Sequence, residues 1–365
     1  MPTIHVIAPF NVAPASASSW FPYAAKVMNL AKMLRPLGWR VIEYAAGASE
    51  SEADEHVEVV TGEELGAFSE PDQAPVRGSQ LWRLFDSRLA VEFAKRPQPG
   101  DFVAHVLGAA HRTLVGDHSQ LVHVEPGVGY SDHAFGAYRI FESRAWRAYM
   151  LGASDGARPD RKKIANPAAT WVVPMAFNLD EWPVGSGSGG YLVHLGRFHP
   201  SKGPKTLAAI VERLVQSPTP VPVVIAGRGD WPSWKAALSP AAQTIVDLRG
   251  EVLGRARADL LGKALAAIYP TAIQEPFGAA AVEGMLCGTP ALTSDFGGFE
   301  DNVLHGYTGY LCREPAEFVA SVMACAATPT ALRENTARWA RAQFSLSECG
   351  PRLNKALMAA ARLRA

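Results

Sequence analysis

Short apolar runs that alternate with helical periodicity restrict the fold of this chain more than any other feature. Ile4 to Ala8 is an apolar run of strand length, residues 23–37 place apolar side chains at helical spacing, and residues 39–45 form a second apolar run. A strand, a helix and a strand in this order are typical of a parallel sheet with helices on both faces. At 365 residues, the chain is long enough for two such domains. The sequence therefore predicts an α/β protein with doubly wound sheets.

The other segments of the first half are assigned from their apolar content and periodicity. Buried strands are expected at residues 101–107 and 121–124, and helices at residues 81–95 and 139–151. Residues 46–80 are acidic, and we expect them to be irregular, with only short strand-like pieces.

A run of Gly and Ser, Pro183 to Gly190, separates the two expected domains. Its composition is typical of a flexible linker. We therefore expect an N-terminal domain at residues 1–183, a C-terminal domain at residues 184–345 and a last helix at residues 346–365. The second domain is expected to include a strand at residues 244–248.

The charge balance argues against a broadly basic nucleic-acid binder. Lys and Arg equal Asp and Glu at 35 each, but residues 1–185 carry 17 basic and 21 acidic side chains, and residues 186–365 carry 18 and 14. The excess in the second half suits a diphosphate site. One basic cluster, residues 139–163, has seven basic and three acidic side chains. A solvated helix face is its simpler interpretation, and contact with an anionic acceptor, a lipid headgroup or a nucleic acid is the alternative.

The sequence also indicates where the protein resides. No apolar run reaches the roughly 20 residues of a transmembrane helix. The first ten residues lack the basic start and small-residue cleavage site of a signal peptide. The four cysteines have no C-x-x-C spacing and are expected to be reduced. We expect a cytoplasmic protein with no transmembrane segment.

The most specific pattern is a pair of carboxylates, Glu275 and Glu283, in the second half. An apolar run at 264–269 is expected to be a buried strand, and residues 279–287 are rich in helix formers. Glu275 is thus expected in a loop and Glu283 on the first turns of a helix. Backbone N–H groups at a helix start bind anions and hydroxyls, because they have no partner within the helix. The expected donors are those of Phe277, Gly278 and Ala279.

This segment resembles the E-x7-E motif of retaining glycosyltransferases with the GT-B fold, most closely family 4 (glycosyl transferases group 1). The similarity includes Glu275-Pro-Phe-Gly at its head and the run from Glu283 to Leu292 at its tail. It implies two Rossmann-like doubly wound domains that face a central cleft. It also implies that Glu275 contacts the donor sugar, as part of the catalytic site, and that Glu283 binds the ribose. A helix cap or a structural ion pair is the alternative for either carboxylate.

A second segment, Tyr191 to Gly203, is similar to the same family's G-R-x4-K-G motif. The resemblance implies that Arg197 and Lys202 bind the nucleotide diphosphate, by charge-assisted hydrogen bonds. Further along, it implies a Gly-rich turn beside the nucleotide at Gly227 and a loop that reads the base through backbone groups. The residues of that loop are Leu248 and Arg249.

The first half resembles the family only in topology. In the family, the loop after the first strand faces the cleft, so its polar residues are candidates for acceptor or phosphate contacts, although a solvated loop explains them equally well. These residues are Asn11, Ser16, Ser18 and Ser19.

The corner from Glu125 to His133 lies near where family members place catalytic and acceptor-side residues, but their T-H-D-like pattern is absent. Here, His133 is expected to hydrogen-bond the donor sugar, Glu125 to orient an acceptor hydroxyl and Tyr130 to stack on a ring. The alternative is that Glu125 and His133 only hold the corner together. At Met175 and Ala176 the chain also departs from the family, which usually has Asn-Gly there.

Together, these resemblances imply an enzyme that moves a hexose-like sugar from a nucleotide-diphosphate donor to an acceptor hydroxyl, with retention of configuration. They imply no cofactor and no metal, and the sequence contains no D-x-D pattern. The acceptor stays open among a small molecule, a glycan, a lipid and modified DNA. The alternatives are an epimerase or phosphorylase of the same fold and a non-catalytic sugar-nucleotide or glycan-binding protein. A further alternative is a phage-type DNA glycosyltransferase that acts on hydroxymethylated bases, because residues 125–130 are similar to part of this phage-type variant of the fold.

Overall fold

The computed structural model describes residues 1–15, 21–68, 78–108, 110, 118–130, 135–156 and 167–364. The chain forms two compact units. The first unit comprises residues 1–142, 147–177 and 346–365, and the second comprises residues 143–146 and 178–345.

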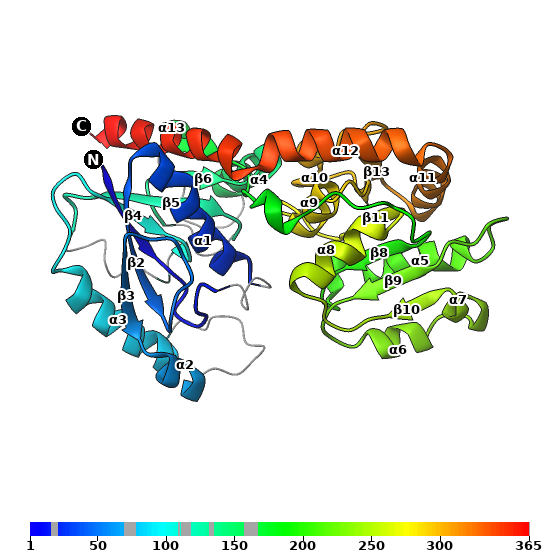
Figure 1. Cartoon of the computed structure of the whole chain (residues 1–365), viewed down its shortest axis with the longest axis horizontal. Coiled ribbons are helices and arrows are strands. Elements are labelled where there is room, and N and C mark those ends of the chain that lie inside the picture. Colours follow the sequence, from blue (N-terminus) through cyan, green and yellow to red (C-terminus); the bar gives the residue numbers. More distant parts are fainter. Residues whose placement is uncertain are drawn as a thin grey trace. The chain divides into compact units, whose positions relative to one another are not determined.

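Seven parallel strands form the sheet of the first unit, in the order β3-β2-β1-β4-β5-β6-β7 (Figure 1). The strands are β1 (Thr3–Ile7), β2 (Arg40–Ala46), β3 (Glu55–Val60), β4 (Phe102–His105), β5 (Val122–Val128), β6 (Tyr138–Phe141) and β7 (Thr170–Val172). The helices are α1 (Pro22–Leu34), α2 (Gly62–Phe68), α3 (Gln80–Phe93), α4 (Arg144–Gly156), α13 (Leu346–Arg364) and the 3₁₀ turns η2 (Arg35–Leu37) and η4 (Pro167–Ala169). Residues 144–146 of α4 belong to the second unit.

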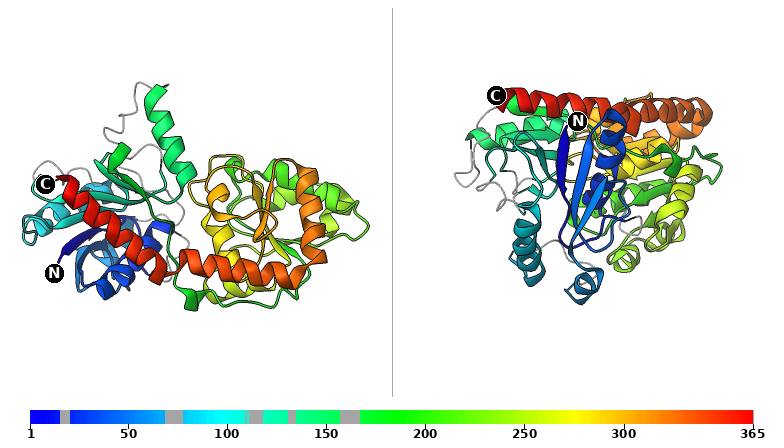
Figure 2. Two further views of the ribbon diagram at one scale, coloured as in Figure 1. Left: turned by 90° about the horizontal axis from the view of Figure 1, so that it is seen from above. Right: turned by 60° about the vertical axis from the view of Figure 1, so that its left-hand side comes forward.

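Helices cover both faces of this sheet, as Figures 1 and 2 show. On one face, Leu30 of α1 and Leu357 of α13 share a core with Ile4 of β1. On the other face, Phe85 of α3 packs in a core with Ile7 of β1. Alternate residues of β1 thus point into opposite cores, as expected for a strand buried on both sides.

Six parallel strands form the sheet of the second unit, in the order β10-β9-β8-β11-β12-β13. The strands are β8 (Leu192–Leu195), β9 (Val223–Ala226), β10 (Val246–Leu248), β11 (Ala266–Tyr269), β12 (Ala291–Ser294) and β13 (Gly309–Cys312). The helices are α5 (Pro204–Leu214), α6 (Trp231–Ala236), α7 (Pro240–Thr244), α8 (Gly254–Lys263), α9 (Ala279–Leu286), α10 (Phe299–Asn302), α11 (Pro315–Ala327), α12 (Pro329–Phe344), η5 (Leu179–Glu181) and η6 (Pro200–Lys202). Both sheets confirm the predicted α/β class with doubly wound parallel sheets.

Three expected elements differ from the structure. Within residues 46–80, β3 corresponds to one of the expected strand-like pieces, but the helix α2 was not expected. Residues 139–151 do not form one helix, because Ile140 and Phe141 lie buried in strand β6 between β5 and β7. The strand expected at residues 244–248 begins only at Val246, because the preceding residues form α7, whose first turn is capped by Ser239.

The Gly/Ser run is also not a flexible linker. Three of its glycines donate backbone hydrogen bonds to neighbouring helices. The Gly187 and Gly189 N–H groups donate to carbonyl oxygens of α8, at 2.9 and 2.8 Å, and the Gly185 N–H donates to the carbonyl oxygen at the end of α9, at 3.0 Å. The buried guanidinium of Arg333, on α12, fixes the same region, because it donates to the carbonyl oxygens of Gly185 and Gly262. A Gly-rich composition therefore serves close backbone packing at this point.

We predict that Arg333→Met destabilises the protein by roughly 2–3 kcal/mol, because it leaves buried carbonyl oxygens without their donor. Urea unfolding at neutral pH measures this change. Arg338→Met is the matched control, since Arg338 is an exposed arginine on the same helix. Equal unfolding free energies for the two variants would contradict the proposed role of Arg333.

Candidate functional site

The carboxyl edge of the second sheet brings the two sequence motifs together. The strand order reverses between β8 and β11, and doubly wound sheets bind ligands at such a switch point. Gly196 and Arg197 follow β8, and the loop that carries Glu275 follows β11. The two motifs therefore meet where the topology leaves room for a ligand.

Two glycines allow the strand corners to come this close. Gly203 has a φ of 69°, and a Cβ there would lie 1.7 Å from the carbonyl oxygen of Pro270. At Gly227, a Cβ would lie 2.0 Å from the carbonyl oxygen of Gly196. Any other residue would push the corners apart, so both glycines are required by the backbone.

A short ion pair joins the two motifs. Lys202 Nζ lies 2.7 Å from Glu275 Oε2, with side-chain exposures of 29% and 14%. Arg197, in the corner that follows β8, is exposed. The site thus presents two cations and one carboxylate that a solvent-borne ligand can reach.

The second carboxylate, Glu283 on α9, is paired with Arg257 on α8. Arg257 Nε lies 2.7 Å from Glu283 Oε2, and its Nη2 contacts the same oxygen. Burial raises the pKa of the Glu283 carboxyl, and the Arg257 guanidinium opposes this shift. Sequence reasoning missed Arg257, because an arginine on a polar helix 26 residues away carries no local signal.

Helix α9 begins where the sequence predicted. Gly278, with a φ of 85°, precedes Ala279, and no side chain caps this helix start. Phe277 is buried and packs edge-on against Phe344. No described side chain accepts from the N–H groups of the first turn, and this helix start follows Glu275 by four residues.

The expected base-reading loop lies beside the Gly227 corner, since the Gly227 N–H donates to the carbonyl oxygen of Gly250 at 2.7 Å. The Arg249 N–H donates to Ile225 in the sheet, and its side chain pairs with Asp247. A base contact through Leu248 or Arg249 stays a prediction. The Arg249 N–H already donates to the carbonyl oxygen of Ile225.

A buried histidine lies under this edge. His194 on β8 donates from Nδ1 to the carbonyl oxygen of Ile268 at 2.8 Å. Burial lowers the pKa of His194 to about 4, so this side chain is neutral at pH 7. The positive charge at the site therefore comes from Lys202 and Arg197.

In the first unit, Glu125 is fully buried and engaged within its own corner. Its carboxylate accepts from the Gly136 N–H at 2.8 Å, from Arg139 Nε at 3.1 Å and from the Tyr130 hydroxyl at 3.2 Å. Burial raises the pKa of Glu125, and Arg139 opposes the shift. These contacts fit the alternative in which Glu125 holds the corner together, and its catalytic role stays a prediction.

The other first-unit candidates are only partly described. Asn11 is half-buried after β1, and Tyr130 lies 6.2 Å from the ring of Tyr23. His133, Ser16, Ser18 and Ser19 lie outside the described residues.

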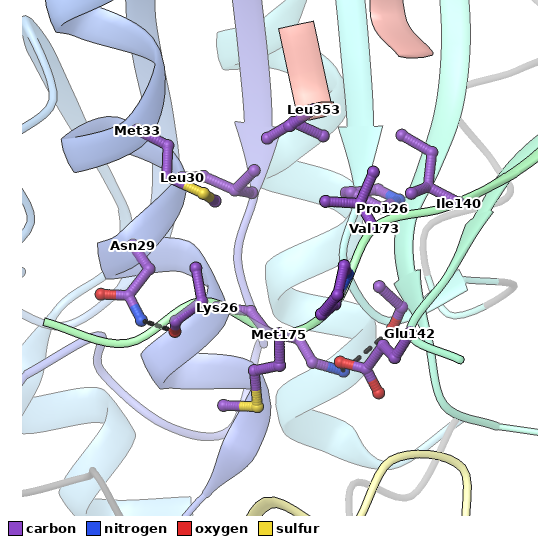
Figure 3. Close-up of a pocket in the computed structure, with 13 residues that line it drawn as sticks. Lys26, Asn29, Leu30, Met33, Pro126, Ile140, Glu142, Val173, Met175 and Leu353 are labelled. Carbon is purple, nitrogen blue, oxygen red and sulfur yellow. Dashed lines mark hydrogen bonds and ion pairs between the residues drawn. The ribbon is translucent and has the colours of Figure 1, made fainter. Parts of the chain in front are cut away.

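A pocket of the first unit lies between α1, α13 and the ends of β5, β6 and β7 (Figure 3). Leu30, Met33 and Leu353 form its apolar end. At the other end, Lys26 Nζ lies 2.8 Å from Glu142 Oε1, and both side chains are nearly buried. The pair neutralises itself, so the pocket offers mainly apolar surface.

Two of the seven basic residues in the 139–163 cluster have structural roles. Arg139 is buried against Glu125, and Arg147 donates to the Thr170 hydroxyl at 2.7 Å. Arg144 is exposed, and the other four lie outside the described residues. The described part thus provides no broad basic surface.

Within the described ranges, no helix is long and apolar enough to cross a membrane. The same residues contain no group of three or more His, Cys, Asp or Glu side chains placed to hold a metal ion.

Sequence comparison finds relatives that include a glycogen synthase and a D-inositol 3-phosphate glycosyltransferase. Glycogen synthase of Mycobacterium tuberculosis is 26% identical over 250 residues, which cover 66% of this chain and 58% of that protein. The chain therefore spans less than two thirds of this relative.

Solved structures cover nearly the whole chain at low identity. Sucrose-phosphate synthase of Thermosynechococcus elongatus matches with a TM-score of 0.71 and 17% identity, over 99% of this chain and all of that one. HepE of Anabaena, solved with UDP and glucose, matches with a TM-score of 0.70 and 16% identity, over 98% and 100%. These likenesses confirm the predicted GT-B fold.

The family model for glycosyl transferases group 1 matches residues 189–327, which contain both carboxylates, Arg197, Lys202 and the glycine corners. This part of the second unit is therefore similar to the glycosyl transferases group 1 family.

Proposed function

We propose that this protein is a glycosyltransferase that moves a hexose-like sugar from a nucleoside-diphosphate donor to an acceptor hydroxyl, with retention of configuration. The observation that carries the proposal is the 2.7 Å contact between Lys202 and Glu275 at the switch point of the second sheet. It unites a diphosphate-binding cation with a hydroxyl-binding carboxylate in one partly exposed site.

In this proposal, Arg197 and Lys202 neutralise the leaving diphosphate. Lys202 has three N–H donors, so it can bind a phosphate oxygen while it still contacts Glu275. Glu275 accepts hydrogen bonds from the sugar hydroxyls. The start of α9 adds backbone donors where negative charge develops.

Glu283 binds the ribose in the same scheme. Arg257 contacts its Oε2, so Oε1 is the oxygen that we assign to the ribose hydroxyls. UDP is the first nucleotide to test, because HepE was solved with UDP. GDP and ADP are the other candidates.

The acceptor is assigned only by class, as a molecule with a free hydroxyl. A nucleic acid is not favoured, because Arg139 and Arg147 of the basic cluster are engaged internally. A non-catalytic sugar-nucleotide binder is the competing function. Mass spectrometry of UDP-, GDP- and ADP-sugars incubated with the protein, with and without acceptors, distinguishes the two functions. An enzyme consumes the nucleotide sugar, whereas a binder leaves it intact.

We expect the two carboxylates to have separable effects. Glu283→Gln weakens donor and free nucleoside diphosphate alike by about tenfold to a hundredfold, because it removes a charged hydrogen-bond acceptor from the ribose. Glu275→Gln leaves nucleoside-diphosphate affinity unchanged and lowers turnover. Calorimetry and sugar consumption measure both, and the opposite pattern would reverse the assignment.

Nucleoside-diphosphate affinity should fall as the pH decreases, because burial raises the pKa of Glu283 and a protonated carboxyl is a weaker hydrogen-bond acceptor for the ribose than the carboxylate. Arg257→Met should move this loss to higher pH, since it removes the cation that opposes the upward shift of the Glu283 pKa. Calorimetry from pH 5 to 8 measures the profile. The exposed Arg255, on the same helix, gives the control Arg255→Met, and identical profiles for both variants would refute the coupling.

Turnover should persist in excess chelator, because Arg197 and Lys202 supply the charge that neutralises the diphosphate. The measurement is the rate of nucleotide-sugar consumption with and without EDTA. Activity that disappears in EDTA and returns with magnesium or manganese would contradict metal independence.

A further inference from the structure

The loop that carries Glu275 is held through three consecutive carbonyl oxygens, each of which accepts a hydrogen bond. The Glu275 oxygen accepts from the Gly298 N–H at 2.6 Å. The Pro276 oxygen accepts from Ser143 Oγ at 2.7 Å, and the Phe277 oxygen accepts from Asn302 Nδ2 at 2.6 Å. Three donors from different parts of the second unit thus fix one short loop.

Ser143 is the most distant of these donors in the sequence, 133 residues before Pro276. It is buried, and its hydroxyl oxygen also accepts from the Trp146 N–H at the start of α4. The preceding N–H, of Ala145, donates to Asp301 Oδ2 at 2.9 Å. The start of α4 is therefore bound both to the loop and to α10, which carries Asn302.

Fixing these carbonyls also sets the directions of the groups that face a ligand. In a trans peptide, the C=O and the following N–H point in opposite directions. The bond from Asn302 to the Phe277 oxygen therefore directs the Gly278 N–H away from α10. The bond from Gly298 fixes the peptide plane directly after Glu275, whose side chain reaches Lys202, and the bond from Ser143 fixes the next plane, between Pro276 and Phe277.

We propose that Ser143 and Asn302 are positioning residues for sugar transfer, which hold the Glu275 loop in the geometry that the transition state requires. This role rests on the proposed function. The hydrogen bonds of Ser143 and Asn302 go to the loop and to the start of α4 rather than to Arg197, Lys202 or Glu283, so both act on turnover through the loop rather than on nucleotide binding. Neither residue was identified from the sequence.

The test compares Ser143→Ala with Ser143→Thr, which keeps the hydroxyl, and with the control Ser321→Ala. Ser321 is a buried serine that donates to the carbonyl oxygen of Glu317 at 2.8 Å, within α11. The readouts are kcat and KM for consumption of UDP-, GDP- and ADP-sugars, nucleoside-diphosphate affinity by calorimetry, and the unfolding temperature.

Ser143→Ala should lower kcat by about tenfold, the loss expected for one hydrogen bond, and change nucleoside-diphosphate affinity by less than about twofold. Ser143→Thr should recover most of the kcat, and Ser321→Ala should leave kcat at the wild-type value. If Ser143→Ala does not fold, Asn302→Asp tests the same role, because it keeps the side-chain size and replaces the donor with an acceptor.

Three results would overturn the role. An unchanged kcat with a lowered unfolding temperature would show that the contacts serve stability only. Equal losses of kcat and nucleotide affinity would show that the whole site collapses. A wild-type protein that binds nucleoside diphosphate but consumes no nucleotide sugar would refute the proposed function itself, together with this role.

Discussion

The close approach of the strand corners at the carboxyl edge of the second sheet is the constraint on which the rest of the site depends. Gly203 lies against the carbonyl of Pro270, and Gly227 lies against that of Gly196, at distances that leave no room for a Cβ. Because the corners touch, Lys202 and Glu275, which are 73 residues apart, come within hydrogen-bond distance. A single methyl group at either glycine would widen the edge and separate these charges.

This edge holds its groups in place before any ligand arrives. The loop after β11 has its three carbonyls bound by Gly298, Ser143 and Asn302. Fixed dipoles stabilise developing charge more effectively than mobile ones, because they need no reorganisation during the reaction. The rigidity of the loop and the electrostatics of the site therefore have the same structural origin.

The sequence predicted the parts of this site that are encoded locally. Glu275, the helix start at Ala279, Arg197 and Lys202 belong to contiguous motifs whose spacing reflects strand, corner and helix. Arg257 and Asn302 were not predicted, because only the tertiary fold brings them to Glu283 and to Phe277.

The same reasoning explains the errors in secondary structure. Residues 139–151 contain enough helix formers to suggest one helix, but the burial of Ile140 between two strands outweighs local propensity. The run from Pro183 to Gly190 has the composition of a linker, yet its backbone N–H groups are bonded along α8 and α9. Composition cannot distinguish a glycine that provides flexibility from one that permits close packing.

Exposure separates the ion pairs that can bind a ligand from those that hold the fold. Glu125 and Arg139 in the first unit have side-chain exposures of 0% and 5%, so a ligand could reach them only if the corner opened. Lys202 and Glu275 are exposed by 29% and 14%, and water already competes for their charges. A polar ligand can replace that water without breaking a buried ion pair. Breaking a buried pair would leave an uncompensated charge. The carboxylate at Glu275 is therefore better suited than the one at Glu125 to contact a substrate.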